Sequence, residues 1–154
     1  MGSKKNDYER LIQELQGNEC EMLLRKLQKG NDFYRLFGNW EDVISLMRSG
    51  TSRDPIKDNV LRPILQANNE KKNSCGQIVL LLIFWPGLRS LYFQKWFWDR
   101  NKEERWRNTV YVFLQVICRI DLNKRNDRLV QKIYNDTVHD LYRLYRRIWD
   151  KTGR

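Results

Sequence analysis

The chain of 154 residues holds a single histidine, His139, and its 8 glycines form no phosphate-binding loop. One histidine excludes metal sites built from several histidines and leaves a histidine-dependent catalytic triad without an alternative base. Asp136 and Asp140 stand near His139 on one expected helix, but an ordinary polar helix edge explains the trio more simply than catalysis does. We therefore expect no enzyme activity, no catalytic residue, no metal site and no cofactor.

Cysteines are few and long apolar runs are absent. Cys20, Cys75 and Cys118 are odd in number and form no CxxC pair, which favours reduced thiols over a disulfide framework. The first residues, MGSKKNDYER, contain no apolar core and so do not form a secretory signal. The most apolar run, Ile78–Leu88, is shorter than the ~20 residues of a membrane span and is interrupted at Pro86. These features predict a cytoplasmic protein without membrane contact, in which the apolar run is a core segment.

Apolar residues are plentiful, and the positive charge is unevenly placed. The sequence is 41% hydrophobic and 12% aromatic, which suits a globular chain with a packed core rather than a disordered one. Residues 1–70 carry 11 basic and 11 acidic side chains, whereas residues 71–154 carry 18 and 8, so the net charge of +10 belongs to the second half. This asymmetry favours a polyanionic partner for that half, nucleic acid before a membrane.

Helical periodicity and capping residues predict an all-α helical bundle, because no stretch alternates like a strand. The polar stretch Asn69–Gln77 divides the chain into a small helical module of unknown role, residues 1–70, and a second domain, residues 71–154. In the first part the expected helices are a capped one from Asn6 to about Gly17, Cys20–Lys29, a short segment at residues 32–37, Trp40–Arg48 after the cap Asn39, and one from Pro55 after the cap Asp54, with a kink or break at Pro63.

Three longer helices are expected in the second domain. The first runs from Gln77 towards Trp98 with a bend at Pro86, and the second runs from about Lys102 to Ile120. After a polar break at residues 121–127, the third covers Arg128–Asp150. The expected inward stripes are Trp106, Val110, Phe113, Leu114 and Ile117 on the second helix, and Leu129, Ile133, Val138, Leu141, Leu144 or Tyr145, and Ile148 on the third.

Aromatic and basic residues are interspersed where the first two of these helices meet. The cluster contains Trp85, Trp96, Phe97, Trp98 and Trp106, interspersed with Arg89, Lys95, Arg100, Arg105 and Arg107. Aromatic faces stack unpaired bases while Arg and Lys neutralise phosphates, so this mixture suits single-stranded nucleic acid. Large aromatic side chains are also typical of the core of a helical bundle. Both interpretations stay open for the cluster.

Three segments follow one another in the second half: an apolar helix (GQIVLLLIFWPGLRSLYF), an acidic-started helix (EERWRNTVYVFLQVICRID) and a basic helix (RNDRLVQKIYNDTVHDLYRLYRR). The second ends in Arg119-Ile120-Asp121. The third carries Tyr134-Asn135-Asp136 and Asp140 before Arg143, Arg146 and Arg147. Over about residues 76–147 this order resembles region 2 of bacterial RNA polymerase sigma factors of the sigma-70 type, especially the small alternative ones.

The resemblance implies a sigma factor-like DNA-binding transcription protein with two partners, the RNA polymerase core and partly single-stranded promoter DNA. It implies that the second helix docks on the polymerase clamp and that the third recognises and helps to melt the −10 element. Melted DNA needs replacement π-faces for its bases and cations for its backbone. The residues implied are Glu103, Glu104, Arg107 and Tyr111 for polymerase, and Lys132, Tyr142, Arg143, Arg146, Arg147 and Trp149 for DNA.

The chain departs from the family pattern at several positions. Leu129 stands where the family usually has Trp, Asp136 stands where it usually has Asn, and Arg107, Val110 and Tyr111 replace an Asp-x-x-Gln-Glu run. The sequence ends at Arg154 without a second helix-turn-helix domain for the −35 element, so we expect either a truncated piece or a relative with another role. The alternative function is a helical protein-interaction module without direct DNA contact, whose aromatic stripe forms a hydrophobic groove or a dimer face.

Overall fold

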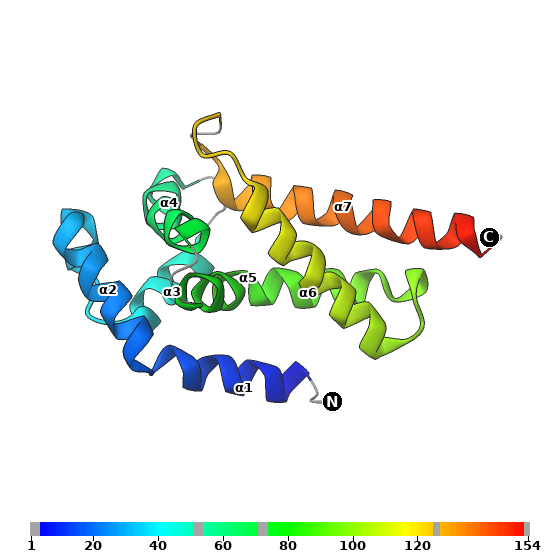
Figure 1. Ribbon diagram of the computed structural model, residues 1–154, viewed down its shortest axis with the longest axis horizontal. Helices are drawn as coiled ribbons and strands as arrows, with labels where there is room; N and C mark the ends of the chain where they lie inside the picture. The colour runs from blue at the N-terminus through cyan, green and yellow to red at the C-terminus, as the bar shows by residue number, and fades with distance from the viewer. Residues whose placement is uncertain (1–3, 51–53, 71–73, 125–126, 153–154) are drawn as a thin grey trace.

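The structure, a computed structural model, describes residues 4–50, 54–70, 74–124 and 127–152, without the side chains of residues 4 and 5. Within these ranges the chain forms α-helices and two short 3₁₀-helices and no strand, which confirms the predicted all-α helical bundle (Figure 1). In chain order the elements are α1 (Lys4–Leu15), α2 (Asn18–Gly30), η1 (Asp32–Leu36), α3 (Trp40–Arg48), α4 (Pro55–Glu70), α5 (Cys75–Gln94), η2 (Trp96–Trp98), α6 (Lys102–Arg119) and α7 (Leu129–Lys151).

The central helix of the bundle is α5, which packs against α1, α2, α3, α4 and α6 (Figure 1). Every residue from Ile78 to Trp85 is buried, so the apolar run lies in the core as the sequence predicts. By length and apolar composition α5 is also a candidate membrane span, a test that buried core helices pass as well. In this fold 67% of its most apolar window is buried inside the protein.

Two prolines lie inside helices without ending them. Because α4 continues through Pro63 and α5 through Pro86, the alternative of a helix break at Pro63 is wrong. Proline has no N–H, so Pro86 leaves the carbonyl of Leu82 without its helical donor. The guanidinium of Arg48, at the end of α3, donates to that carbonyl through Nε at 3.1 Å and also through Nη2. A side chain from the first half of the chain thus satisfies the helix at the centre of the core.

Both halves of the chain contribute to one hydrophobic core. Leu24 and Ile64 from the first 70 residues belong to the same buried cluster as Phe113 and Leu141 from the second half. In addition, α4 packs against both α6 and α7. The predicted boundary near residue 70 falls between α4 and α5, where residues 71–73 lie outside the described ranges.

Local capping begins two of the helices as predicted. Asn39 Oδ1 accepts the backbone N–H of Asp42 at 2.9 Å at the start of α3, and Asp54 Oδ1 accepts the N–H of Ile56 at 3.1 Å at the start of α4. The expected start at Asn6 is wrong, because α1 already includes Lys4. Lysine is a good helix former, so nothing in this stretch stops the helix from extending past the expected cap.

The buried faces of α6 and α7 follow the predicted stripes with one clear error. Most of the predicted residues are buried or half-buried, but Ile148 is 39% exposed. The last turns of α7 instead bury Tyr145, and Ile148 borders a groove beside the α5–α6 turn. Polar residues that the stripes omitted are buried too, because Thr109 and Thr137 satisfy their hydroxyls on the carbonyls of Arg105 and Ile133, both at 2.8 Å.

Candidate nucleic-acid interface

The solvent face of α7 carries three exposed arginines, Arg143, Arg146 and Arg147. They lie opposite the stripe that buries Leu141 and Tyr145 against the core, since positions three and four apart share a helix face. Among the described residues, none of these three guanidinium groups has an ion pair or a hydrogen bond with the protein. Their charge is therefore directed to solvent, where a phosphate group has access to it.

The other three predicted DNA residues are engaged with neighbours. Lys132 Nζ lies 3.0 Å from Asp136 Oδ2 in a partly exposed ion pair. Tyr142 is 40% exposed, and its ring centroid lies 5.6 Å from that of Trp98. Trp149 is half-buried and donates its indole N–H to the carbonyl of Trp98 at 3.3 Å. All six predicted residues thus lie on α7, and within the described part of the chain the three arginines are the unpaired ones.

The aromatic cluster of the sequence divides into a buried part and an exposed part. Trp85, Trp98 and Trp106 are buried, with at most 9% of each side chain exposed. Trp96 and Phe97, in the turn between α5 and α6, are 54% and 56% exposed. Three consecutive aromatic residues in a helical turn point in different directions, so they cannot all face one core. The WFW sequence therefore indicates that part of it lies outside the core, but it does not indicate which of the three residues.

Arg105 belongs to the interior and not to the basic surface. It is 4% exposed, and its guanidinium donates to the carbonyls of Tyr92 at 2.9 Å and Asp99 at 2.6 Å. The same group lies 4.1 Å from the centroid of the Tyr92 ring. The sequence pattern grouped this arginine with the surface cations, whereas its contacts hold the end of α5 to the start of α6.

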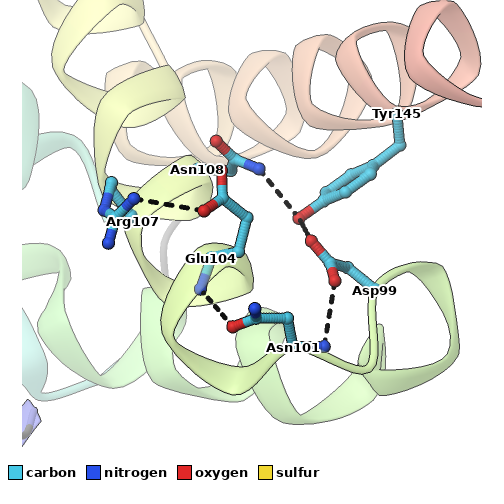
Figure 2. A network of polar contacts seen from close by, with 6 residues as sticks. All are labelled: Asp99, Asn101, Glu104, Arg107, Asn108 and Tyr145. Atoms are coloured by element: carbon cyan, nitrogen blue, oxygen red, sulfur yellow. Dashed lines mark hydrogen bonds and ion pairs between the residues drawn. The ribbon is translucent and has the colours of Figure 1, made fainter.

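A polar network joins the turn between α5 and α6 to the C-terminal half of α7 (Figure 2). The Asp99 carboxylate accepts the hydroxyl of Tyr145 at 2.9 Å and the backbone N–H of Asn101 at 3.0 Å. The Asn108 amide donates to the same tyrosine oxygen at 3.0 Å. Burial is the main reason why the pKa of Tyr145 is raised above its usual value. No sequence motif predicts this network, because its residues come from three separate elements that only the fold brings together.

The four residues predicted to contact polymerase lie together on the outer face of α6. Glu103 is exposed, and Glu104 forms a surface ion pair with Arg107 at 3.1 Å. Tyr111 is 52% exposed, and its hydroxyl accepts the amide N–H of Gln115 at 2.7 Å. The arrangement presents a mixed polar and aromatic surface to solvent, on a helix whose other side packs on α5 and α7.

His139 lies between two grooves, and the carboxylates near it have other partners. In the groove between the C-terminal end of α6 and α7, Asp140 pairs with Arg119, and Asp136 pairs with Lys132. Each carboxylate is therefore engaged by a cation. Within the described residues no group of three or more His, Cys, Asp or Glu side chains forms a candidate metal site.

Comparison of the chain with known proteins gives no relative. No protein-family model, no curated protein and no solved structure matches it. The fold and the surface together define the class as an all-α bundle with an arginine-rich helix exposed beside a turn of aromatic residues.

Proposed function

We propose that the chain is a sigma factor-like DNA-binding transcription protein, in which α7 contacts a partly single-stranded promoter −10 element together with the RNA polymerase core. The observation that carries the proposal is the exposed set Arg143, Arg146 and Arg147, which has no partner among the described residues and lies on a helix packed on its other side. Arginine forms bidentate contacts with phosphate, and each neutralised phosphate releases bound counterions. The exposed ring of Tyr142 beside these arginines supplies a face for an unpaired base.

The promoter and polymerase parts of the proposal rest on the sequence resemblance. They are supported by the outward position of Glu103, Glu104, Arg107 and Tyr111 on α6, which leaves this helix accessible to a second protein. α6 and α7 pack against each other, so one body can present a protein-binding helix and a DNA-binding helix at once.

The DNA contact is tested by changing Arg143, Arg146 and Arg147 to Ala together. We expect weaker binding to forked DNA and a salt dependence whose log–log slope falls by about 0.7–0.9 for each phosphate that is no longer neutralised. Helicity and melting temperature should stay unchanged, because these exposed guanidinium groups hold no other part of the fold in place. Fluorescence anisotropy across a salt series measures both the affinity and the slope.

The matched control removes the same charge elsewhere. Arg10, Arg25 and Arg35 are exposed on the first half of the chain, each with an acidic neighbour three or four residues away. Their triple change to Ala should affect binding far less than the triple change on α7. Equal losses in the two variants would mean that net charge alone, and not the α7 surface, attracts DNA.

A pull-down with purified RNA polymerase core tests the transcription part separately. We expect the chain to retain the core enzyme and the Glu103→Ala/Tyr111→Ala variant to retain less of it. If the wild-type chain does not bind the core enzyme, the sigma-like role is wrong, whereas the DNA contact on α7 is judged by its own experiment.

A helical protein-interaction module without DNA contact is the second candidate. It is favoured by the exposed aromatic side chains of Phe93, Trp96 and Phe97, more than half of whose surfaces face solvent. The discriminating result is the absence of any binding to single-stranded and forked DNA at low salt, which only this second function predicts.

A further inference from the structure

Two aromatic side chains in the turn between α5 and α6 face solvent although the core lies directly behind them. The ring centroids of Trp96 and Phe97 lie 6.0 Å apart, and each side chain is more than half exposed. Trp98, the next residue, is buried against Tyr142, Tyr145 and Trp149 of α7. The turn is thus anchored by one tryptophan and presents two neighbouring rings outwards, although burying them would be favourable by ~2 kcal/mol each.

Two cations of the same turn lie near its aromatic side chains, one beside the exposed Trp96 and one beside the buried Trp98. The Arg100 guanidinium lies 6.0 Å from the centroid of the Trp96 ring, and Lys95 Nζ lies 4.8 Å from that of Trp98. The acid in the same turn, Asp99, is half-buried and lines a groove with Phe97 and Arg100, and its carboxylate accepts the Tyr145 hydroxyl (Figure 2). The outward surface of the turn therefore combines aromatic faces with cations, which is the chemistry that unpaired nucleotides require.

A groove lies beside this turn. It has a volume of about 560 Å³, lies between the end of α5 and the middle of α7, and is bordered by Trp98. Among the described residues no carboxylate lines it, unlike the α6–α7 groove with Asp136 and Asp140 and the groove beside Phe97 with Asp99 and Glu104. The polar residues along it include Gln94, Lys95, Asn135 and His139, and Tyr142 lies next to Arg143 in the sequence of α7. A strand that passes from α7 into this groove therefore meets no carboxylate among the described residues that line it.

We propose that the turn between α5 and α6 is a second contact surface for single-stranded nucleic acid. Unpaired bases stack on Trp96 and Phe97, while Lys95 and Arg100 neutralise the neighbouring phosphates. The proposal rests on the DNA-binding function of α7 and extends the bound strand beyond that helix, through the groove beside Trp98. A nucleic acid fits this surface better than a lipid bilayer, because amide and imidazole groups in the groove find hydrogen-bond partners on bases but none in hydrocarbon.

The test compares a Trp96→Ala/Phe97→Ala variant with the wild-type chain on labelled oligo(dT) and on duplex DNA of equal length. Stacking on an aromatic residue is worth about 1–3 kcal/mol per base, so the double change should weaken oligo(dT) binding by at least about tenfold. The slope of affinity against salt should stay the same, because stacking releases no counterions. Duplex binding should change little. The matched control, Met22→Ala/Leu36→Ala, removes two exposed apolar side chains from the other half of the chain and should leave both affinities unchanged.

The outcomes separate this proposal from the function proposed for α7. If the aromatic variant binds oligo(dT) like the wild type while the α7 arginine variant does not, the second surface is wrong and the α7 contact stands. If neither variant weakens binding, both proposals fail. Sedimentation with phosphatidylserine-containing vesicles tests whether the turn binds a membrane instead. Vesicle binding that depends on Trp96 and Phe97, with unchanged oligo(dT) affinity, would assign the turn to a membrane and overturn the proposal.

Discussion

At the scale of single residues, Tyr145 joins α7 to the turn between α5 and α6 and to α6 itself. Its ring is 2% exposed and packs near Trp98 and Trp149, while its hydroxyl contacts Asp99 and Asn108. The sequence predicted Leu144 or Tyr145 in the inward stripe of this helix, and the burial of Tyr145 confirms it. Which partner the hydroxyl finds could not be predicted, because Asp99 lies 46 positions away and approaches only through the fold.

Changing Tyr145 to Phe should lower the free energy of unfolding by ~1–2 kcal/mol, because the Asp99 carboxylate and the Asn108 amide lose a partner.

The same variant should also change how the stability of the protein depends on alkaline pH. Burial raises the pKa of Tyr145, so its contribution to stability is complete below the ordinary tyrosine pKa of 10.0 and is lost as the pH rises towards the folded value. Chemical denaturation at a series of pH values should therefore show a smaller alkaline loss for the variant. The surface change Tyr111→Phe is the control, and equal effects of the two changes would contradict this role.

At the scale of elements, the start of α7 is stabilised from a distant helix. Asp58 of α4 accepts the backbone N–H groups of Arg128 at 2.9 Å and Leu129 at 2.8 Å. Arg128 has φ 52°, a left-handed conformation that costs energy for a residue with a side chain. The carboxylate offsets this cost and also lies at the positive end of the helix dipole. The caps Asn39 and Asp54 were predictable because their partners lie two or three residues ahead, whereas Asp58 stands 70 positions before Arg128.

We expect Asp58→Ala to destabilise the protein by ~0.5–2 kcal/mol, the usual cost of losing a helix cap. Asp58→Asn should recover much of this loss, since its side-chain oxygen still accepts one N–H bond. Asp32→Ala, which removes a carboxylate that is 91% exposed, should change stability by less than about 0.5 kcal/mol. Urea denaturation gives the three values. A full loss in both Asp58 variants would show that charge, and not capping, is what matters there.

At the scale of the whole molecule, the two predicted domains differ in charge but contribute to one core. α5 begins the second domain, yet it packs on α1, α2, α3 and α4 of the first. Gly76 shows how closely α5 approaches α4, because a Cβ atom at this position would lie 2.9 Å from the backbone nitrogen of Asn68 in α4. The sequence marked the change of charge at this point, but it carried no sign that the helices on either side pack together.

A fragment of residues 71–154 should therefore fold poorly by itself. Its α5, in which every residue from Ile78 to Trp85 is buried in the complete chain, would lose the cover of α1, α2, α3 and α4. We expect a broad thermal transition, loss of the near-ultraviolet circular dichroism signal and binding of a hydrophobic dye, as in partly packed states. The full-length chain measured in parallel is the reference. A fragment that melts cooperatively at the temperature of the complete chain would instead support two independent domains.

The sequence by itself determined the helical class, the burial of Ile78–Trp85 and the concentration of positive charge in the second half. These properties depend on periodicity and composition within short stretches of sequence, so they can be predicted without knowledge of the fold. Only the tertiary structure decided that Trp96 and Phe97 face solvent while Trp98 is buried, and that Arg48 supplies the donor that Pro86 removes. Such outcomes depend on which distant helix occupies the neighbouring space, and no local pattern contains that information.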